Sequence, residues 1–242
     1  MCFSDVASFT VAAACACAGT YAVLKSPSPR YLTLATIPLF FAVHQATEGA
    51  IWRAIGLSAD GVVSGDLPAV FKFFATIFWP VFIPFAVYMA EEHPGRRSIL
   101  AVLMGIGALV SFAYLIPFVN SDVSAGVIGH SVHYTSPIKA GIAIPVWLLS
   151  GAQGGSDWIL VPYAAATIGS LACSSLLPVR IFAVIVTIAL SVLMVVNQTT
   201  LVSVWCFFAA SGSLMIVPSI QAARFRSASA SKFNAIPSQT PL

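Results

Sequence analysis

The sequence predicts an all-α integral membrane protein, built as a bundle of seven transmembrane helices. Of its 242 residues, 59% are apolar and only 8% are charged, whereas soluble domains carry about 25% charged residues. The apolar residues also fall into segments of about 20, which is the length that a helix needs to cross a bilayer. A lipid bilayer is therefore the expected surrounding of the chain. The formal charge of +3 gives no basis for nucleic-acid binding.

Short polar or proline-containing connections separate the predicted spans. These spans are residues 6–24, 31–52, 69–90, 98–118, 158–176, 181–196 and 199–220. In the third span, Trp79-Pro80 and Pro84 predict a kink near the middle of the membrane. We expect one transmembrane domain over residues 1–223. The tail, residues 224–242, is rich in Ser, Ala and Pro, and is predicted to be disordered and cytosolic.

Residues 138–149 are apolar but only about half as long as a span. They would be either an eighth crossing or a short re-entrant or interfacial segment, and the distribution of basic residues decides between the two. With seven spans, one side holds Lys25, Arg30, Arg96, Arg97, Arg180, Arg224, Arg226 and Lys232, and the other holds Arg53, Lys72 and Lys139. An eighth crossing would remove this bias. We therefore expect seven spans, with a non-cytosolic N-terminus and a cytosolic C-terminus.

The most informative stretch lies in the second span, where a carboxylic acid and an imidazole occur in an apolar run. His44 and Glu48 are four residues apart and share one helix face, with Gln45 beside them and Trp52 one turn further on. An ionisable group in hydrocarbon costs about 2.5 kcal/mol or more, so it usually faces the bundle interior. Either the pair fixes helix packing through interhelical hydrogen bonds, or Glu48 serves as a general acid in an apolar cavity.

Two histidines in the polar connection after the fourth span form a second candidate site. His130 and His133 have the spacing of two metal ligands on one helical turn, and Glu48 or Asp66 would complete the set. The alternative is a pair of interfacial loop histidines without a metal. Because no third strong ligand stands at a recognisable spacing, the sequence predicts neither a metal nor another cofactor. The five cysteines have no zinc-cluster spacing either.

Several motifs together resemble an uncharacterised multi-pass membrane family whose members open with Met-Cys-Phe-Ser. The matching segments are residues 1–4, 7–9, 38–41, 48–49, 52, 78–84, 96–97, 130, 134, 174–175 and 205–206. The resemblance covers most of the chain and is weakest over residues 136–158. It implies a seven-span fold and singles out Cys2, Glu48, Trp52, Trp79, His130 and Trp205. It names no substrate.

The sequence holds no Asp-Asp-x-x-Asp run, no phosphate-binding loop and no Gly-x-Ser-x-Gly elbow. In size and span number the chain is similar to the small membrane terpene cyclases of meroterpenoid pathways. We therefore expect a membrane-embedded enzyme that cyclises or isomerises an apolar, isoprenoid-type substrate. The expected proton donor is Glu48, aided by His44 and His130. Substrate-binding residues would be Gln45, Trp52, Trp79, Tyr134 and Trp205.

Two alternatives belong to other functional classes. The first is a metal-dependent lipid hydrolase that uses His44, Glu48, His130 and His133. The second is a non-enzymatic seven-span receptor or carrier whose polar end binds a ligand. In every case the expected partners are the lipid bilayer and an apolar small molecule.

Overall fold

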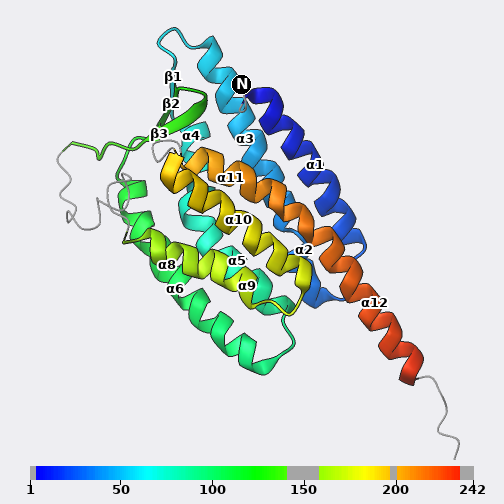
Figure 1. The fold of residues 1–242 in the computed structure, drawn as a ribbon. Helices are drawn as coiled ribbons and strands as arrows, with labels where there is room; N and C mark the ends of the chain where they lie inside the picture. Colours follow the sequence, from blue (N-terminus) through cyan, green and yellow to red (C-terminus); the bar gives the residue numbers. More distant parts are fainter. Residues whose placement is uncertain (1–3, 141–157, 197–200, 235–242) are drawn as a thin grey trace, which may run out of the picture.

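Long helices run side by side as a bundle, with a small β-sheet at one end, in the computed structural model, which describes residues 4–140, 158–196 and 201–234 (Figure 1). The helices are α1 (Asp5–Leu24), α2 (Leu32–Ala35), α3 (Ile37–Leu57), α4 (Asp66–Phe73), α5 (Trp79–Ala90), α6 (Pro94–Val119), α8 (Leu160–Ala164), α9 (Ser170–Cys173), α10 (Leu177–Val196), α11 (Leu201–Gly212) and α12 (Ile216–Asn234). The N-terminus lies at the sheet end of the bundle, and α12 runs out at the other end.

Five helical segments are long and apolar enough to cross a membrane, so the chain has the architecture of a membrane protein. They are Asp5–Leu24, Asp66–Ala90, Pro94–Val119, Leu177–Val195 and Leu201–Phe225. Within the described residues, five helices meet this criterion, and not the seven that the sequence predicts. The other two expected spans are also helical, but α3 includes polar residues of the His44–Glu48 face and Leu160–Cys173 is short. The expected segment 138–149 lies largely outside the described residues.

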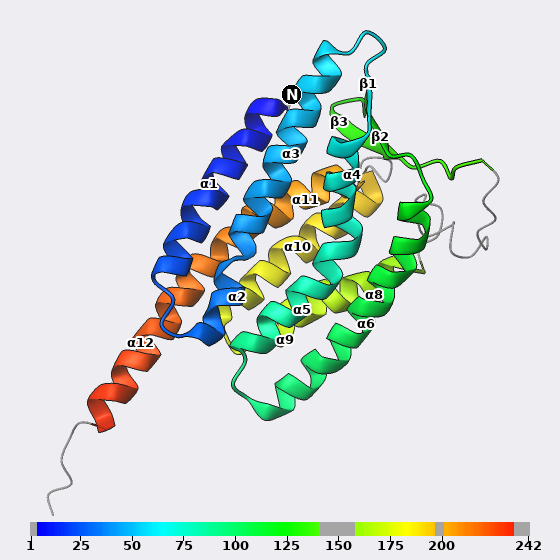
Figure 2. The ribbon, with the colours of Figure 1, turned by 180° about the vertical axis from the view of Figure 1, so that it is seen from behind.

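Helices α1 and α3 lie side by side along their length, as the view from behind also shows (Figure 2). Two glycines permit this close approach. A Cβ atom on Gly19 would lie 2.7 Å from the Leu39 side chain, and one on Gly49 would lie 2.9 Å from the Phe9 ring. Small residues at such positions let helix backbones come together in membranes, where packing drives association. The face of α3 that carries Glu48 is thereby fixed relative to α1.

The predicted kink region of the third span contains a π-helical segment. This first π segment (Phe74–Phe78) joins α4 to α5 and is followed at once by Trp79 and Pro80. Proline lacks an N–H and its ring clashes with the preceding turn, so a wider local turn relieves the strain. The altered bonding leaves carbonyl groups for side chains of other helices: Ser111 Oγ donates to the Ile77 carbonyl at 2.6 Å.

The prediction of a purely helical protein is wrong at one end of the bundle, where three strands form an antiparallel sheet. They are β1 (Val62–Ser64), β2 (Ser124–Ile128) and β3 (Ser131–Thr135), in the order β1-β2-β3. Strands β2 and β3 are joined through Gly129 and His130, and Gly129 has φ 62°. Two-residue hairpin turns favour glycine because it adopts positive φ without strain.

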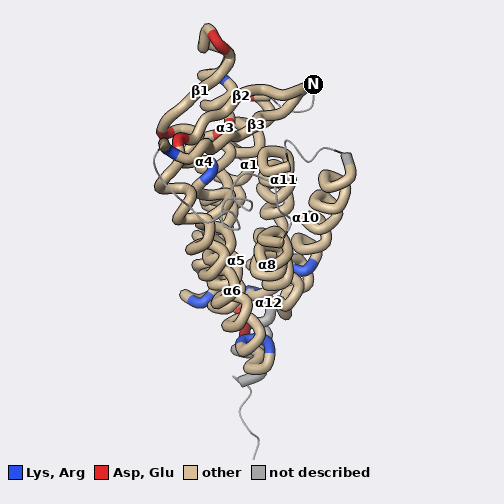
Figure 3. The backbone as a smooth tube through the Cα atoms, turned by 90° about the vertical axis from the view of Figure 1, so that its left-hand side faces the viewer, with Lys and Arg blue, Asp and Glu red and all other residues tan. Residues whose placement is uncertain are grey.

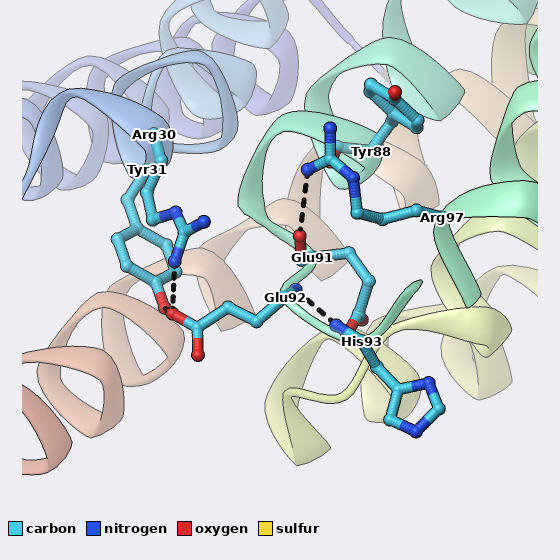
Figure 4. A network of polar contacts seen from close by, with 7 residues as sticks. All are labelled: Arg30, Tyr31, Tyr88, Glu91, Glu92, His93 and Arg97. Atoms are coloured by element: carbon cyan, nitrogen blue, oxygen red, sulfur yellow. Dashed lines mark hydrogen bonds and ion pairs between the residues drawn. The ribbon is translucent and has the colours of Figure 1, made fainter. Parts of the chain in front are cut away.

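Charged residues gather toward the two ends of the bundle, and its middle is almost entirely uncharged (Figure 3). At the end away from the sheet, a polar network joins the α5–α6 connection to the segment before α2 (Figure 4). There Arg30 pairs with Glu92 at 2.5 Å, and the Tyr31 hydroxyl donates to the same carboxylate at 3.2 Å. Beside them, Arg97 donates to the Tyr88 carbonyl at 3.2 Å.

The C-terminal segment differs from the expected disordered tail. Helix α12 continues without a break to Asn234, so residues 224–234 are helical. Residues 224–234 contain no Gly or Pro, and their polar composition is compatible with a helix that leaves the bundle. The remaining tail residues, 235–242, lie outside the described part.

Candidate functional site

Three neighbouring polar side chains of α3 are buried in the bundle. His44 and Gln45 are 0% exposed and Glu48 is 2% exposed. Positions 44 and 48 are one turn apart, so the helical repeat places them on one face, with position 45 adjacent. Because α1, α4 and α11 pack around α3, this face points into protein and not into lipid.

The partner of Glu48 comes from α11, at the other end of the sequence. The Ser203 hydroxyl donates a hydrogen bond to Glu48 Oε1. Ser203 is 2% exposed and Cys206, one turn further along α11, is 5% exposed. Neither residue was predicted as a site residue, although Cys206 lies in the matching segment 205–206. The local signal for them is a polar pair at i and i+3 among mostly apolar residues of α11.

His44 has both ring nitrogens engaged. The Trp79 indole N–H donates to His44 Nδ1 at 3.3 Å, and His44 Nε2 lies 3.1 Å from the carbonyl oxygen of Phe71. An indole N–H is only a donor and a carbonyl is only an acceptor, so the imidazole is neutral with its proton on Nε2. His44 therefore joins α3 to α4 and α5, and its lone pair is already used. This arrangement fixes the orientation of the His44 ring one helical turn from Glu48.

Tyr134 brings the sheet into the same site. Its ring stacks on Phe71 with centroids 4.5 Å apart and planes 2° apart. Burial first, and then the nearby Glu48 carboxyl and Cys206 thiol, raise the pKa of the Tyr134 hydroxyl well above its ordinary value. The phenol is therefore a neutral group that retains its proton. We call His44, Gln45, Glu48, Tyr134, Ser203 and Cys206 the polar cluster.

A cavity of about 40 Å³ adjoins the polar cluster at Cys206. Its lining is almost wholly apolar and consists of Phe41, Trp79, Tyr163, Thr167, Ile168, Leu171, Val186, Trp205, Cys206 and Ala209. Trp79 stacks on Phe41 at 3.9 Å between ring centroids, which makes one aromatic wall. The structure thus brings two of the predicted substrate-binding residues, Trp79 and Trp205, to one cavity.

One π segment lines part of this cavity and is tied to the other. The second π segment (Ala165–Gly169) contributes Thr167 and Ile168 to the lining. The Tyr163 hydroxyl, just before it, donates to the Ala75 carbonyl in the first π segment at 2.6 Å. Single π turns inside α-helices are rare and often occur at functional sites. The Tyr163 hydroxyl therefore links the two π segments next to the cavity.

The remaining predicted site residues are placed differently. Trp52 is half-buried and packs with Tyr134 against the same small core. His130 is exposed in the β2–β3 turn, and His133 lies in β3. These two histidines therefore do not share a helical turn, which corrects the expected geometry. Within the described residues, no group of three His, Cys, Asp or Glu side chains is placed to hold a metal. Cys2 lies outside those residues.

Comparison with known proteins identifies a protein family. The model of a family described as "Family of unknown function (DUF6629)" matches residues 1–232. No curated protein and no solved structure matches the chain. The family match agrees with the resemblance to an uncharacterised family. The architectural likeness to terpene cyclases gains no support from it.

Proposed function

The chain belongs to a family of unknown function (DUF6629), and from the geometry of its polar cluster we propose that it is a membrane-embedded enzyme. In this proposal Glu48 is the general acid. The single observation that supports this proposal is a buried carboxyl group, 2% exposed, close to Cys206, which lines an aromatic-walled apolar cavity. Acids in such surroundings donate protons to reacting groups, and pKa tuning by burial is a common means to that end.

The proposed reaction starts with proton transfer from Glu48 to a carbon–carbon double bond of an apolar substrate. The transfer leaves the Glu48 carboxylate and a carbocation. The cyclised or isomerised cation then returns a proton to this carboxylate, which regenerates the acid as the C–H electron pair forms a new double bond. The faces of Trp79 and Trp205 would stabilise the cation, since cation–π attraction reaches about 2 kcal/mol or more when desolvated. Ser203 would hold the carboxylate, because a hydroxyl donor strengthens toward a charged acceptor.

The volume of the cavity limits which part of a substrate fits. A single water molecule needs a cavity of about 10–15 Å³, and this cavity has a volume of about 40 Å³. The space thus matches a few heavy atoms, which is the reacting end of an isoprenoid-type chain and not the whole molecule. The rest of the chain would extend between helices toward the lipid. This fit favours isomerisation at a chain end over cyclisation of a long chain.

The proposal includes the topology of the bundle. All seven predicted spans would cross the bilayer, with α3 and Leu160–Cys173 shielded by the five more apolar helices. The N-terminus at the sheet end and α12 at the opposite end support an odd number of crossings (Figure 1). The N-terminus would be non-cytosolic. Epitope tags on each terminus should differ in protease access in sealed vesicles, and termini on the same side would contradict the topology.

The enzymatic proposal is tested by the lipids that purify with the protein. Glu48→Gln keeps the shape of the side chain and removes the acid, so unreacted substrate should accumulate on this variant and be detected by mass spectrometry. Glu92→Gln, an acid at the far end with a side chain 62% exposed, serves as the control and should match wild type. Identical lipid profiles for Glu48→Gln and wild type, together with unchanged turnover of an identified substrate, would refute the proposal.

A further inference from the structure

Three buried polar atoms of the polar cluster have no hydrogen-bond partner among the described residues. They are Nε2 and Oε1 of Gln45 and the hydroxyl oxygen of Tyr134. The Gln45 amide lies beside the Glu48 carboxyl, and Tyr134 lies near the same carboxyl. Native proteins leave few buried polar atoms unpaired, and each one calls for a water, an ion or a ligand. Here all three belong to two residues that lie close to one acid.

The chemistry of these atoms restricts which group could complete their hydrogen bonding. Gln45 offers one donor group and one acceptor, and Tyr134 offers a hydroxyl that both donates and accepts. A hydroxyl group also donates once and accepts, so it matches this set. An anionic head group would find no cationic partner, because the polar cluster contains a carboxylic acid and no Lys or Arg. His44 offers no free nitrogen, since Trp79 and the Phe71 carbonyl occupy both.

The apolar cavity restricts the rest of the ligand. It meets the polar cluster at Cys206, whose side chain belongs to both. A molecule with a single polar group and an apolar chain would satisfy both parts at once. We propose that the polar cluster binds the hydroxyl group of a lipid alcohol, whose apolar end enters the cavity. This inference shares its site with the proposed function but requires no proton transfer by Glu48.

Binding of two matched ligands tests the inference. Geraniol and its methyl ether differ in one O–H donor and have the same apolar chain. We expect the protein in lipid nanodiscs to bind radiolabelled geraniol at least ten-fold more tightly than the ether. Tyr134→Phe removes only the hydroxyl and keeps the ring on Phe71, so this variant should lose the preference. Gln45→Leu should lose it as well.

Tyr21→Phe is the matched control, because Tyr21 lies near the far end of α1, where its hydroxyl meets Gln221 at 3.4 Å. This control should keep the full preference for the alcohol. Equal binding of alcohol and ether by wild type would overturn the inference. So would an undiminished preference in Tyr134→Phe, which would show that ordered water alone fills the site.

The wild-type comparison separates this inference from the enzymatic proposal. If Glu48→Gln processes substrate normally while wild type discriminates alcohol from ether, the enzymatic proposal fails and the alcohol site stands. If Glu48→Gln blocks the reaction while wild type binds both ligands equally, the alcohol site fails and the acid catalyst stands.

Discussion

The Ser203 hydroxyl donates a hydrogen bond to the Glu48 carboxyl across the contact between α11 and α3, and so joins residues 155 positions apart in the chain. Both side chains are only 2% exposed, so bulk water cannot readily replace the hydrogen-bond partner of either one. The bond thus has two consequences. It fixes the direction of the acid relative to the cavity, and it ties the last part of the bundle to the second predicted span.

Replacement of Ser203 by Ala should destabilise the protein. The variant leaves a buried carboxyl without its donor, and such a loss costs about 1–3 kcal/mol. Thermal unfolding in detergent should show a lower Tm than for wild type. Ser211→Ala is the control, because that hydroxyl donates to the Phe207 carbonyl of its own helix at 3.0 Å and so does not join α11 to another helix. Equal Tm values for the two variants would contradict the structural role of Ser203.

Trp79 and His44 should be energetically coupled. Trp79→Phe removes the indole N–H that His44 Nδ1 accepts at 3.3 Å and keeps an aromatic ring against Phe41. In a double-mutant cycle with His44→Phe, we expect a coupling free energy of at least about 0.5 kcal/mol, as for residues in direct contact. Denaturant unfolding of the four proteins in detergent measures it. Strictly additive effects would show that this hydrogen bond contributes nothing to stability.

Much of the helical layout could be predicted from the sequence, because apolar length and polar breaks set where a helix in lipid begins and ends. The two strands within residues 124–135 were not predicted. Each is too short for the length of an apolar segment to indicate it, and the Gly129-His130 turn was the one local indication of a hairpin. Prediction also failed at residues 224–234, since polar composition alone does not exclude a helix. Whether α3 and Leu160–Cys173 span the membrane depends on their packed neighbours, and a sequence read segment by segment lacks this information.

The candidate site was predicted only in its rarest residues. Glu48, His44 and Gln45 stood out because polar groups are costly in an apolar span. Ser203 and Cys206 were missed because small polar residues are common in membrane helices and carry no such cost. The pairing of Tyr163 with the Ala75 carbonyl could not be foreseen, since it follows from two π segments that meet only in the folded bundle.

Gly107 should tolerate no side chain. A Cβ atom there would lie 1.8 Å from the Pro80 carbonyl oxygen on the neighbouring helix, and that atom belongs to a backbone that cannot swing aside. We expect Gly107→Ala to lower stability by about 1–3 kcal/mol or more, as overpacking does. Gly105→Ala, on the same helix, meets no atom within 4 Å and should be neutral or slightly stabilising. Expression yield and Tm compare the two, and similar values would rule out a close α5–α6 contact.

Glu91 should make the stability of the protein sensitive to acid. Its side chain is 2% exposed at the α5–α6 connection. Burial opposes ionisation of this carboxyl, but hydrogen bonds from the backbone N–H groups of His93, Ser175 and Glu92 outweigh it and lower its pKa. The bond from Ser175, at 2.7 Å, ties this connection to the one before α10.

A lowered pKa in the folded state means that the carboxylate stabilises the fold at neutral pH. This contribution is lost as the pH falls from the ordinary carboxyl value of about 4.3 through the lower folded-state pKa. Glu91→Gln should therefore have a lower Tm than wild type at about pH 6, and the difference should shrink toward about pH 3. Glu92→Gln removes an exposed ion pair, which is worth at most about 1 kcal/mol, and should differ little from wild type. A Tm difference between Glu91→Gln and wild type that stays constant over this range would show that the Glu91 carboxylate is not the acid-sensitive group.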